Sequence, residues 1–321
     1  MSQLVSGLSV VMPTYNGASF LVQSLESLRA QTRPVLEVIA IDDGSTDDTV
    51  AILEEYSERL PLTLLSRCRR GWVANTNEGI EAARGRYLSI LHQDDTWHPR
   101  RVELLERAAD RWSAPALIFH PVQFVDSRSR VVGRLTAPQA SREQLIEPQT
   151  MLERLIVQNF IAVPSVALRR ELLPSARPMS ERLWYSADWR LWLQVAGRWG
   201  ALYLPETLAS FRLHGASLTV KGAAGEDDFR SQLEAVQKEW IRPGHGFSDS
   251  VVRAARYSVE VNVGLAAAAG SPTAALRLAV QGFALGWKAL REFVVCSRIH
   301  QRALARVRAG VFRITFASSR D

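Results

Sequence analysis

The stretch that decides the fold is Tyr87–Asp95, with the sequence YLSILHQDD. It begins as an apolar run of the kind that forms a buried parallel strand, and it ends in two adjacent carboxylates, Asp94 and Asp95. In an open α/β sheet, ligands bind at the carboxyl ends of the strands. Paired carboxylates there suit a divalent metal that itself holds phosphate oxygens. They suit equally the capping of a helix after Pro99, and both interpretations stay open.

The residues before this stretch alternate between strand patterns and helix patterns. Strands are expected at 8–12, 36–41, 62–65 and 87–91, with helical spacing in each interval between them. Pro13 and Gly17 are expected to break the first strand into a loop. This alternation predicts a parallel, doubly wound α/β sheet.

Polar residues follow several of these strands. Tyr15 comes after the first strand, and Asp42 and Asp43 come at the end of the second. Neither a G-x-G-x-x-G loop nor a G-x-x-x-x-G-K-[ST] loop occurs, so the sequence lacks the usual loops that bind dinucleotides and nucleoside triphosphates. Taken singly, Tyr15 fits a turn residue and the acidic pair fits a helix start. Together with Asp94 and Asp95, they favour a nucleotide–metal site.

Length and composition limit the classes of protein to which the chain could belong. The chain has 321 residues, 47% of them hydrophobic, which is enough for a full α/β domain and an appendage. Cys68 and Cys296 lie far apart, so they indicate a reducing compartment and neither a disulfide framework nor a zinc site. The net charge of +6 permits anionic partners. We expect no signal peptide and no membrane-spanning helix.

Four motifs, in this order and at this spacing, resemble family 2 glycosyltransferases of the GT-A fold. They are Val10–Gly17 (VVMPTYNG), Ile41–Thr49 (IDDGSTDDT), Asn75–Ile80 (NTNEGI) and Leu91–Asp95 (LHQDD). The resemblance implies an inverting transferase that uses a nucleoside diphosphate sugar, with a UDP- or dTDP-sugar as the expected donor. The order of the motifs makes it more specific than any one motif alone.

The resemblance also implies roles for individual residues. Asp94 takes the last position of the D-x-D metal motif, so the expected cofactor is a divalent metal, Mn or Mg. His92 replaces the first Asp of that motif, and Thr76 stands where many relatives carry Arg. The residues expected to bind the nucleotide are Pro13, Tyr15, Asn16, Asp43, Asn77, His92 and Gln93.

A second set of residues is expected near the acceptor. Asp188 comes just before Leu191-Trp192-Leu193, where the family places its catalytic base, although an N-cap is the structural alternative. His214, in an Arg-x-His pattern, is expected to complete the metal shell. Contacts to the diphosphate or the acceptor are expected from Asp95, Arg212, Trp184 and Tyr185.

The last third of the sequence is predicted to be helical. We therefore expect a GT-A domain over residues 1–220 and a helical C-terminal region over residues 221–321. Basic and apolar residues interleave from Lys288 to Arg313. This pattern fits a helix lying on an anionic membrane surface, and it fits an ordinary solvated helix face equally well. We expect a cytoplasmic protein, with peripheral attachment to the inner face of the cell membrane as the alternative.

The sequence thus predicts metal-dependent, inverting transfer of a sugar to a hydroxyl of a glycan or lipid-linked acceptor. Such enzymes commonly build bacterial surface polysaccharide, which is an analogy at the level of the family. One alternative is a non-catalytic nucleotide-sugar-binding protein. The other is a basic nucleic-acid-binding protein, against which stands the absence of any recognised binding motif.

Overall fold

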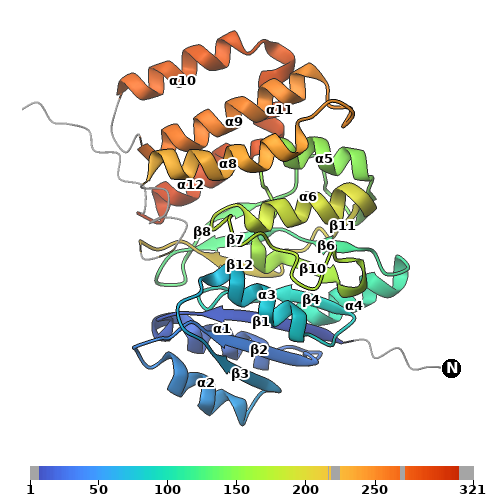
Figure 1. Ribbon diagram of the computed structural model, residues 1–321, viewed down its shortest axis with the longest axis vertical. Helices are drawn as coiled ribbons and strands as arrows, with labels where there is room; N and C mark the ends of the chain where they lie inside the picture. The colour runs from blue at the N-terminus through green and yellow to red at the C-terminus, as the bar shows by residue number, and fades with distance from the viewer. Residues whose placement is uncertain (1–6, 216, 218–224, 268–271, 311–321) are drawn as a thin grey trace, which may run out of the picture. The chain divides into compact units, whose positions relative to one another are not determined.

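The computed structural model describes residues 7–215, 217, 225–267 and 272–310 (Figure 1). The chain divides into two compact units. The first comprises residues 1–123, 140–151 and 161–211, and the second comprises residues 124–139, 152–160 and 212–321. The second unit therefore takes two segments from within the first 220 residues, in addition to the helical C-terminal part.

The first unit is built on an eight-stranded sheet of order β3-β2-β1-β4-β10-β6-β11-β9. Strands β3, β2, β1 and β4 are parallel, as predicted, while β10 runs antiparallel to both β4 and β6. The bounds are β1 Leu8–Thr14, β2 Glu37–Asp42, β3 Leu62–Ser66, β4 Tyr87–Ile90, β6 Leu117–Phe119, β9 Gln144–Ile146, β10 Val166–Arg169 and β11 Ala201–Tyr203.

The helices of the first unit connect these strands. Helix α3 packs so closely on β1 and β2 that a Cβ at Gly79 would lie 2.4 Å from Cγ1 of Val11, and the bare glycine permits the contact. The bounds are α1 Ala18–Arg29, α2 Thr49–Ser57, α3 Trp72–Ala82, α4 Arg101–Arg111, α5 Pro148–Val157 and α6 Ala187–Trp199, with 3-10 turns at Val163–Ser165 and Arg170–Leu172. Helix α5 begins in the first unit and ends in the second.

One sequence expectation about this unit was wrong. Strand β1 does not end at Pro13 but continues to Thr14, because its pairing with β4 already ends at Val11 and the missing N–H of proline is not needed there. Residues 128–147 contain the strand β8 (Val131–Leu135), which belongs to the second unit, and the strand β9. Short antiparallel strands β5 (Thr96–Trp97) and β12 (Ala209–Arg212) also pair, and β7 spans Val122–Val125.

The second unit is mainly helical. Helix α9 contacts α8, α10 and α11, and Gly264 on α9 lets a side chain of α10 approach. Helix α12 packs on β8, where a Cβ at Gly133 would lie 2.9 Å from Cβ of Ala305. The bounds are α8 Glu226–Trp240, α9 Asp249–Ala267, α10 Pro272–Ala284, α11 Trp287–Ser297 and α12 Ile299–Arg308.

No helix in the described part of the chain is both long and apolar enough to cross a bilayer.

Candidate functional site

The carboxyl ends of β1 and β4 are joined by a pair of reciprocal hydrogen bonds. The backbone N–H of Tyr15 donates to Oε1 of Gln93 over 2.8 Å, and Nε2 of Gln93 donates to the carbonyl oxygen of Tyr15 over 2.9 Å. Gly17 leaves room for this amide, since a Cβ at residue 17 would lie 2.2 Å from Oε1 of Gln93. The structure thus gives Gln93 a positioning role toward Tyr15, and its predicted contact with a nucleotide stays a prediction.

The end of β1 is also joined to the loop after β2. Asn16 adopts a left-handed backbone conformation with φ of 46°. Its N–H donates to Oγ of Ser45 over 2.9 Å, and its side-chain Oδ1 accepts from the N–H of Thr46 over 2.8 Å. Pro13 lies buried within β1, opposite Ile41 of β2. The predicted residues of the first two motifs are therefore adjacent in the fold.

Asp43, at the end of β2, holds the loop that leads into α3. Its carboxylate accepts hydrogen bonds from the N–H groups of Arg70, over 2.6 Å, and Gly71, over 2.9 Å. The same loop places the guanidinium of Arg69 over the ring of Tyr15, 4.9 Å from the ring centroid. Nη2 of Arg69 also donates a hydrogen bond to the hydroxyl of Tyr15. The sequence reasoning missed Arg69, which brings a cation beside the predicted base-binding ring.

Trp72, the first residue of α3, links the end of β4 to the segment before α6. Its ring meets that of His92 edge-on, with centroids 5.4 Å apart, and its Nε1–H donates to the carbonyl oxygen of Trp184 over 2.6 Å. The rings of Trp184 and Tyr185 lie 5.5 Å apart in a T-shaped arrangement. Trp72 was not predicted, and the only signal for it was its place directly after a glycine at a helix start.

Asn77 is buried on α3 and exchanges two hydrogen bonds with Met179. Its Nδ2 donates to the carbonyl oxygen of Met179 over 2.8 Å, and its Oδ1 accepts from the N–H of Met179 over 2.9 Å. These contacts favour a positioning role over direct contact with a nucleotide. Thr76, also buried, donates to the carbonyl oxygen of Trp72 within the same helix over 2.7 Å.

His92, Asp94 and Asp95 form a cluster that fits a metal ion. Each offers one ligand atom, and these atoms all lie within 4.8 Å of one another. Nε2 of His92 is buried and makes no hydrogen bond to any residue that the structure describes. Burial lowers the pKa of His92, although the nearby Asp94 charge opposes the shift; the lowered pKa favours the neutral imidazole, which has a nitrogen lone pair to offer a ligand.

Asp188 lies in the first turn of α6 and is 8% exposed. The residue at the N-cap position is Ser186, so the interpretation of Asp188 as the N-cap is wrong. Asp188 follows Trp184 and Tyr185 in the segment that Trp72 ties to the end of β4. Asp188 therefore comes directly after the segment that carries the predicted acceptor contacts, two residues into α6.

Arg212 and His214 belong to the second unit. Arg212 is buried and donates through Nη1 to the carbonyl oxygen of Asp126 over 2.9 Å and to Oγ of Ser129 over 3.0 Å. These bonds fix Arg212 within its own unit. The diphosphate contact predicted for Arg212 and the metal contact predicted for His214 stay predictions.

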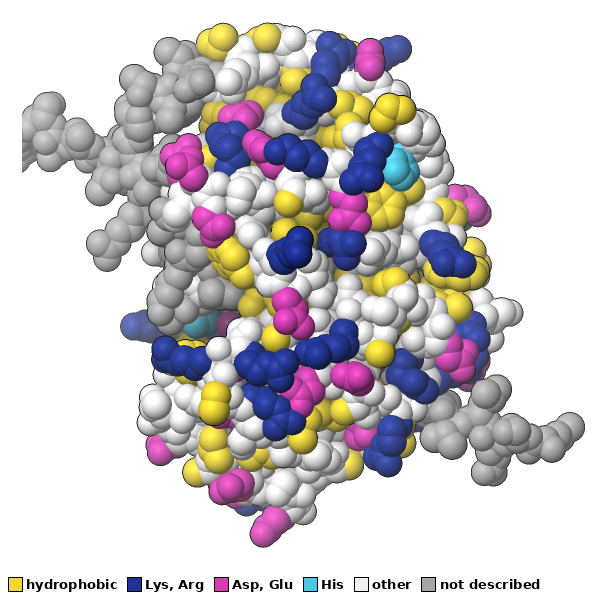
Figure 2. All heavy atoms as spheres, viewed as in Figure 1, with side chains coloured by type: hydrophobic (Ala, Val, Ile, Leu, Met, Phe, Trp, Pro, Cys, Tyr) yellow, Lys and Arg dark blue, Asp and Glu magenta, His cyan; other side chains and the backbone are white. Residues whose placement is uncertain are grey.

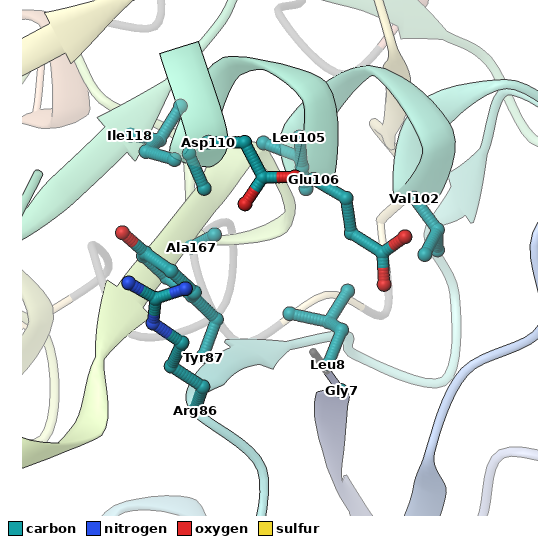
Figure 3. A pocket seen from close by; sticks show the side chains of 11 residues that line it. Gly7, Leu8, Arg86, Tyr87, Val102, Leu105, Glu106, Asp110, Ile118 and Ala167 are labelled. Atoms are coloured by element: carbon teal, nitrogen blue, oxygen red, sulfur yellow. The ribbon is translucent and has the colours of Figure 1, made fainter. Parts of the chain in front are cut away.

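A hollow lies at the other edge of the sheet, at the amino ends of β1 and β4 (Figure 3). Leu8 and Leu105 lie at its apolar wall, with the carboxylates of Glu106 and Asp110 beside them. It encloses about 20 Å³, which is room for about one water molecule. A nucleotide sugar does not fit there, so the carboxyl-edge cluster is the better candidate site.

Residues 9–174 match the family model described as glycosyl transferase family 2, which is more than half of the chain. The chain belongs to this family. The prediction of a family 2 glycosyltransferase is therefore confirmed at the level of the family.

The chain is also similar to individual proteins. The chain is 29% identical over 246 residues to the uncharacterized protein Rv1520 of Mycobacterium tuberculosis, a match that covers 75% of this chain and 66% of that protein. The chain thus spans slightly less than two thirds of the length of this relative. Among solved structures, TarS of S. aureus is similar over 92% of both chains, with a TM-score of 0.59 and 16% identity.

A second similar structure is the mannosyltransferase PcManGT of Pyrobaculum calidifontis in complex with GDP-Man and Mn²⁺. It matches 95% of this chain and 86% of its own, with a TM-score of 0.54 and 20% identity. TarS has been solved in complex with UDP-GlcNAc. At these identities the likeness shows the fold, and the predicted GT-A fold with additional C-terminal helices is confirmed.

Proposed function

We propose that this chain is a metal-dependent, inverting glycosyltransferase that moves a sugar from a nucleoside diphosphate sugar to an acceptor hydroxyl. The observation that carries the proposal is the cluster of His92, Asp94 and Asp95 at the end of β4, in a chain of family 2. Beside it, Gln93 holds the backbone of Tyr15. A cluster that fits a metal ion and an aromatic ring thus lie at the edge where an open α/β sheet binds its ligand.

The donor site uses Tyr15 and Asp43 for the base. The ring of Tyr15 offers a stacking face, and each carboxylate oxygen of Asp43 keeps a lone pair beyond its bond to the α3 loop. The complexes of TarS and PcManGT contain UDP-GlcNAc and GDP-Man, which supports a nucleoside diphosphate sugar as donor without choosing the base. Our proposed donor is a UDP- or dTDP-sugar.

The metal would be held by Asp94, with His92 and Asp95 as the neighbouring donors. Carboxylate oxygens suit Mg²⁺ and Mn²⁺, and an imidazole nitrogen favours a transition metal, so the donor set fits Mn²⁺. When bound, such an ion neutralises charge on the leaving diphosphate. Mn²⁺ in the PcManGT complex supports this assignment.

Asp188 is the proposed general base. Its carboxylate takes the proton of the acceptor hydroxyl while the acceptor oxygen forms a bond to the anomeric carbon. The bond from that carbon to the diphosphate oxygen breaks on the opposite face, and its electron pair leaves with the diphosphate. The configuration at the anomeric carbon is therefore inverted. Trp184 and Tyr185, on the same segment, are the proposed acceptor contacts.

The acceptor we propose is a glycan or a lipid-linked saccharide, and the setting is bacterial surface polysaccharide synthesis. Both come from the family analogy. We place the protein in the cytoplasm, with peripheral attachment to the inner face of the cell membrane as the alternative.

Calorimetry with UDP, dTDP and GDP, each with and without Mn²⁺, tests the donor site. The wild type is expected to bind one nucleotide, and Asp94→Asn is expected to lose the metal-dependent part of that binding. The exposed Asp110, at the opposite edge of the sheet, provides a matched control in Asp110→Asn, which is expected to bind as the wild type does. Failure of the wild type to bind any of the three would overturn the proposal.

A second variant tests the base. Asp188→Asn is expected to bind donor as the wild type does and to transfer sugar at least about a hundredfold more slowly. Full activity in Asp188→Asn would remove the assignment of Asp188. A wild type that binds donor but transfers to no hydroxyl acceptor, water included, would identify a non-catalytic nucleotide-sugar-binding protein instead.

A further inference from the structure

Two helices of the second unit expose large apolar side chains. Phe283 at the end of α10 is 86% exposed, and Trp287 at the start of α11 is 77% exposed. Val280 on α10 is 60% exposed and Val294 on α11 is 47% exposed. We call these four residues the α10–α11 patch. Scattered exposed apolar residues are normal, but two aromatic rings this exposed on adjacent helices mark an interaction surface.

The spacing of these residues places them on the outer faces of the helices. Val280 and Phe283 are three residues apart on α10, and Trp287 and Val294 are seven apart on α11, so each pair shares a helix face. The opposite face of α11 is buried through Ala289, Phe293 and Cys296. Trp287 and Val294 therefore lie on the face of α11 that points away from the core.

One basic side chain lies on the same face of α11, and a second lies beside that face. Arg291 is exposed and stands four residues after Trp287 and three before Val294, so it shares their face. Lys288 is exposed and lies about 100° around the helix from Trp287. Arg291 forms an ion pair with Glu292, over 3.5 Å. At the top of the view in Figure 2, the surface over the C-terminal helices shows hydrophobic side chains next to Lys and Arg side chains.

Several other basic residues of the stretch from Lys288 to Arg313 form hydrogen bonds within the second unit. Arg298 breaks it into two helices by its left-handed conformation, with φ of 48°, and donates to the carbonyl oxygen of Ala137 over 2.7 Å. Arg302 donates to Oδ1 of Asn262 over 3.3 Å. Arg308, on α12, donates to the carbonyl oxygen of Val132 over 3.5 Å. Arg306 also lies on α12, so Lys288 and Arg291 are the basic residues of this stretch that stand on α11 with the patch. Residues 311–313 of the stretch lie outside the described residues.

We propose that the α10–α11 patch docks the protein on an anionic lipid bilayer. Exposed Phe and Trp rings gain by entering the boundary between headgroups and acyl chains, and Lys288 and Arg291 beside them attract anionic headgroups. A folded protein partner would also bury apolar rings, but the pairing of aromatic and basic groups on one face is complementary to an anionic membrane. The proposal is independent of the transfer chemistry, since no residue of the donor site takes part.

Sedimentation with vesicles tests the proposal. The full chain is mixed with vesicles of phosphatidylcholine alone, or of phosphatidylcholine with an equal amount of phosphatidylglycerol. The wild type is expected to sediment with the anionic vesicles only. The double variant Phe283→Ser/Trp287→Ser is expected to lower the partition constant by about tenfold or more, and Lys288→Gln/Arg291→Gln by about tenfold.

Trp199→Ser is the matched control, because Trp199 is another exposed tryptophan, at 44%, on α6 of the other unit. It is expected to sediment as the wild type does. All variants change exposed side chains, so their melting temperatures should equal that of the wild type. The proposal is overturned if the wild type ignores anionic vesicles, or if the patch variants bind them equally well. Light scattering that shows a dimer dissociated by Phe283→Ser/Trp287→Ser, with no vesicle binding, would assign the patch to a second copy of the chain.

Discussion

Replacing Gly17 by alanine should disconnect the end of β1 from the end of β4 without touching either strand. The new Cβ would lie 2.2 Å from Oε1 and 2.3 Å from Cδ of Gln93, and no other group comes as close. The backbone of Gly17 has φ of −105°, which alanine adopts without strain. The amide of Gln93 must therefore move, and both of its hydrogen bonds to Tyr15 are lost.

The size of the effect follows from these contacts. Two neutral hydrogen bonds contribute about 1 kcal/mol each, so their loss costs about 2 kcal/mol of the free energy of unfolding. Alanine in place of glycine raises the free energy of unfolding by about 0.4–1 kcal/mol, because it lowers the conformational entropy of the unfolded chain. We expect Gly17→Ala to be destabilised by about 1–1.5 kcal/mol and Gln93→Ala by about 2 kcal/mol. In the Gln93→Ala background the clash is gone, so Gly17→Ala should then stabilise by about 0.5 kcal/mol.

Urea denaturation of the wild type, both single variants and the double variant measures this cycle, with circular dichroism as the signal. The decisive quantity is the sign of the Gly17→Ala effect, which should reverse when Gln93 is absent. Calorimetry with the bound nucleotide should show an affinity loss of about tenfold in both single variants, because each releases Tyr15. Additive stability losses in the double variant would refute the reasoning, since Gly17 and Gln93 would then act independently.

Three further predictions concern buried polar groups. Asn77→Ala should lower the free energy of unfolding by about 2 kcal/mol, measured in urea, because both hydrogen bonds to Met179 are lost. His120 is buried and accepts a hydrogen bond from Nε of Arg101; burial and that cation hold the pKa of His120 well below its usual range. Below about pH 6.5 the unfolded chain therefore binds more protons than the folded chain. The free energy of unfolding should keep its full value above about pH 6.5 and decrease as the pH drops below it. In His120→Leu this decrease should be smaller. Arg101→Lys should cost about 2–3 kcal/mol, by thermal or urea denaturation, because the guanidinium stacks on Trp97 at 3.8 Å and donates to both Ser89 and Val166.

The sequence determined the parallel core of the fold. Apolar runs that end in polar residues predicted β1, β2, β3 and β4 and the edge of the sheet where Tyr15, Asp43 and Asp94 come together. These features follow from local patterns, because a buried strand must be apolar and a loop at its end must carry the polar groups. The spacing of the four motifs was enough to predict the family.

Tertiary structure alone decided how the site is held together. Gln93 reaches Tyr15 across 78 residues, and Trp72 reaches Trp184 across 112. No periodicity encodes such pairs, so the sequence left Trp72 and Arg69 without a role and did not predict the hydrogen bonds of Gln93 to Tyr15 or of Asn77 to Met179. The same limit applies to Arg298 and Arg302, whose charges fitted a membrane face and a solvated helix face equally well, and whose hydrogen bonds lie inside the second unit. A side chain's type fixes what it can bind, but its partner depends on which distant segment the fold brings beside it.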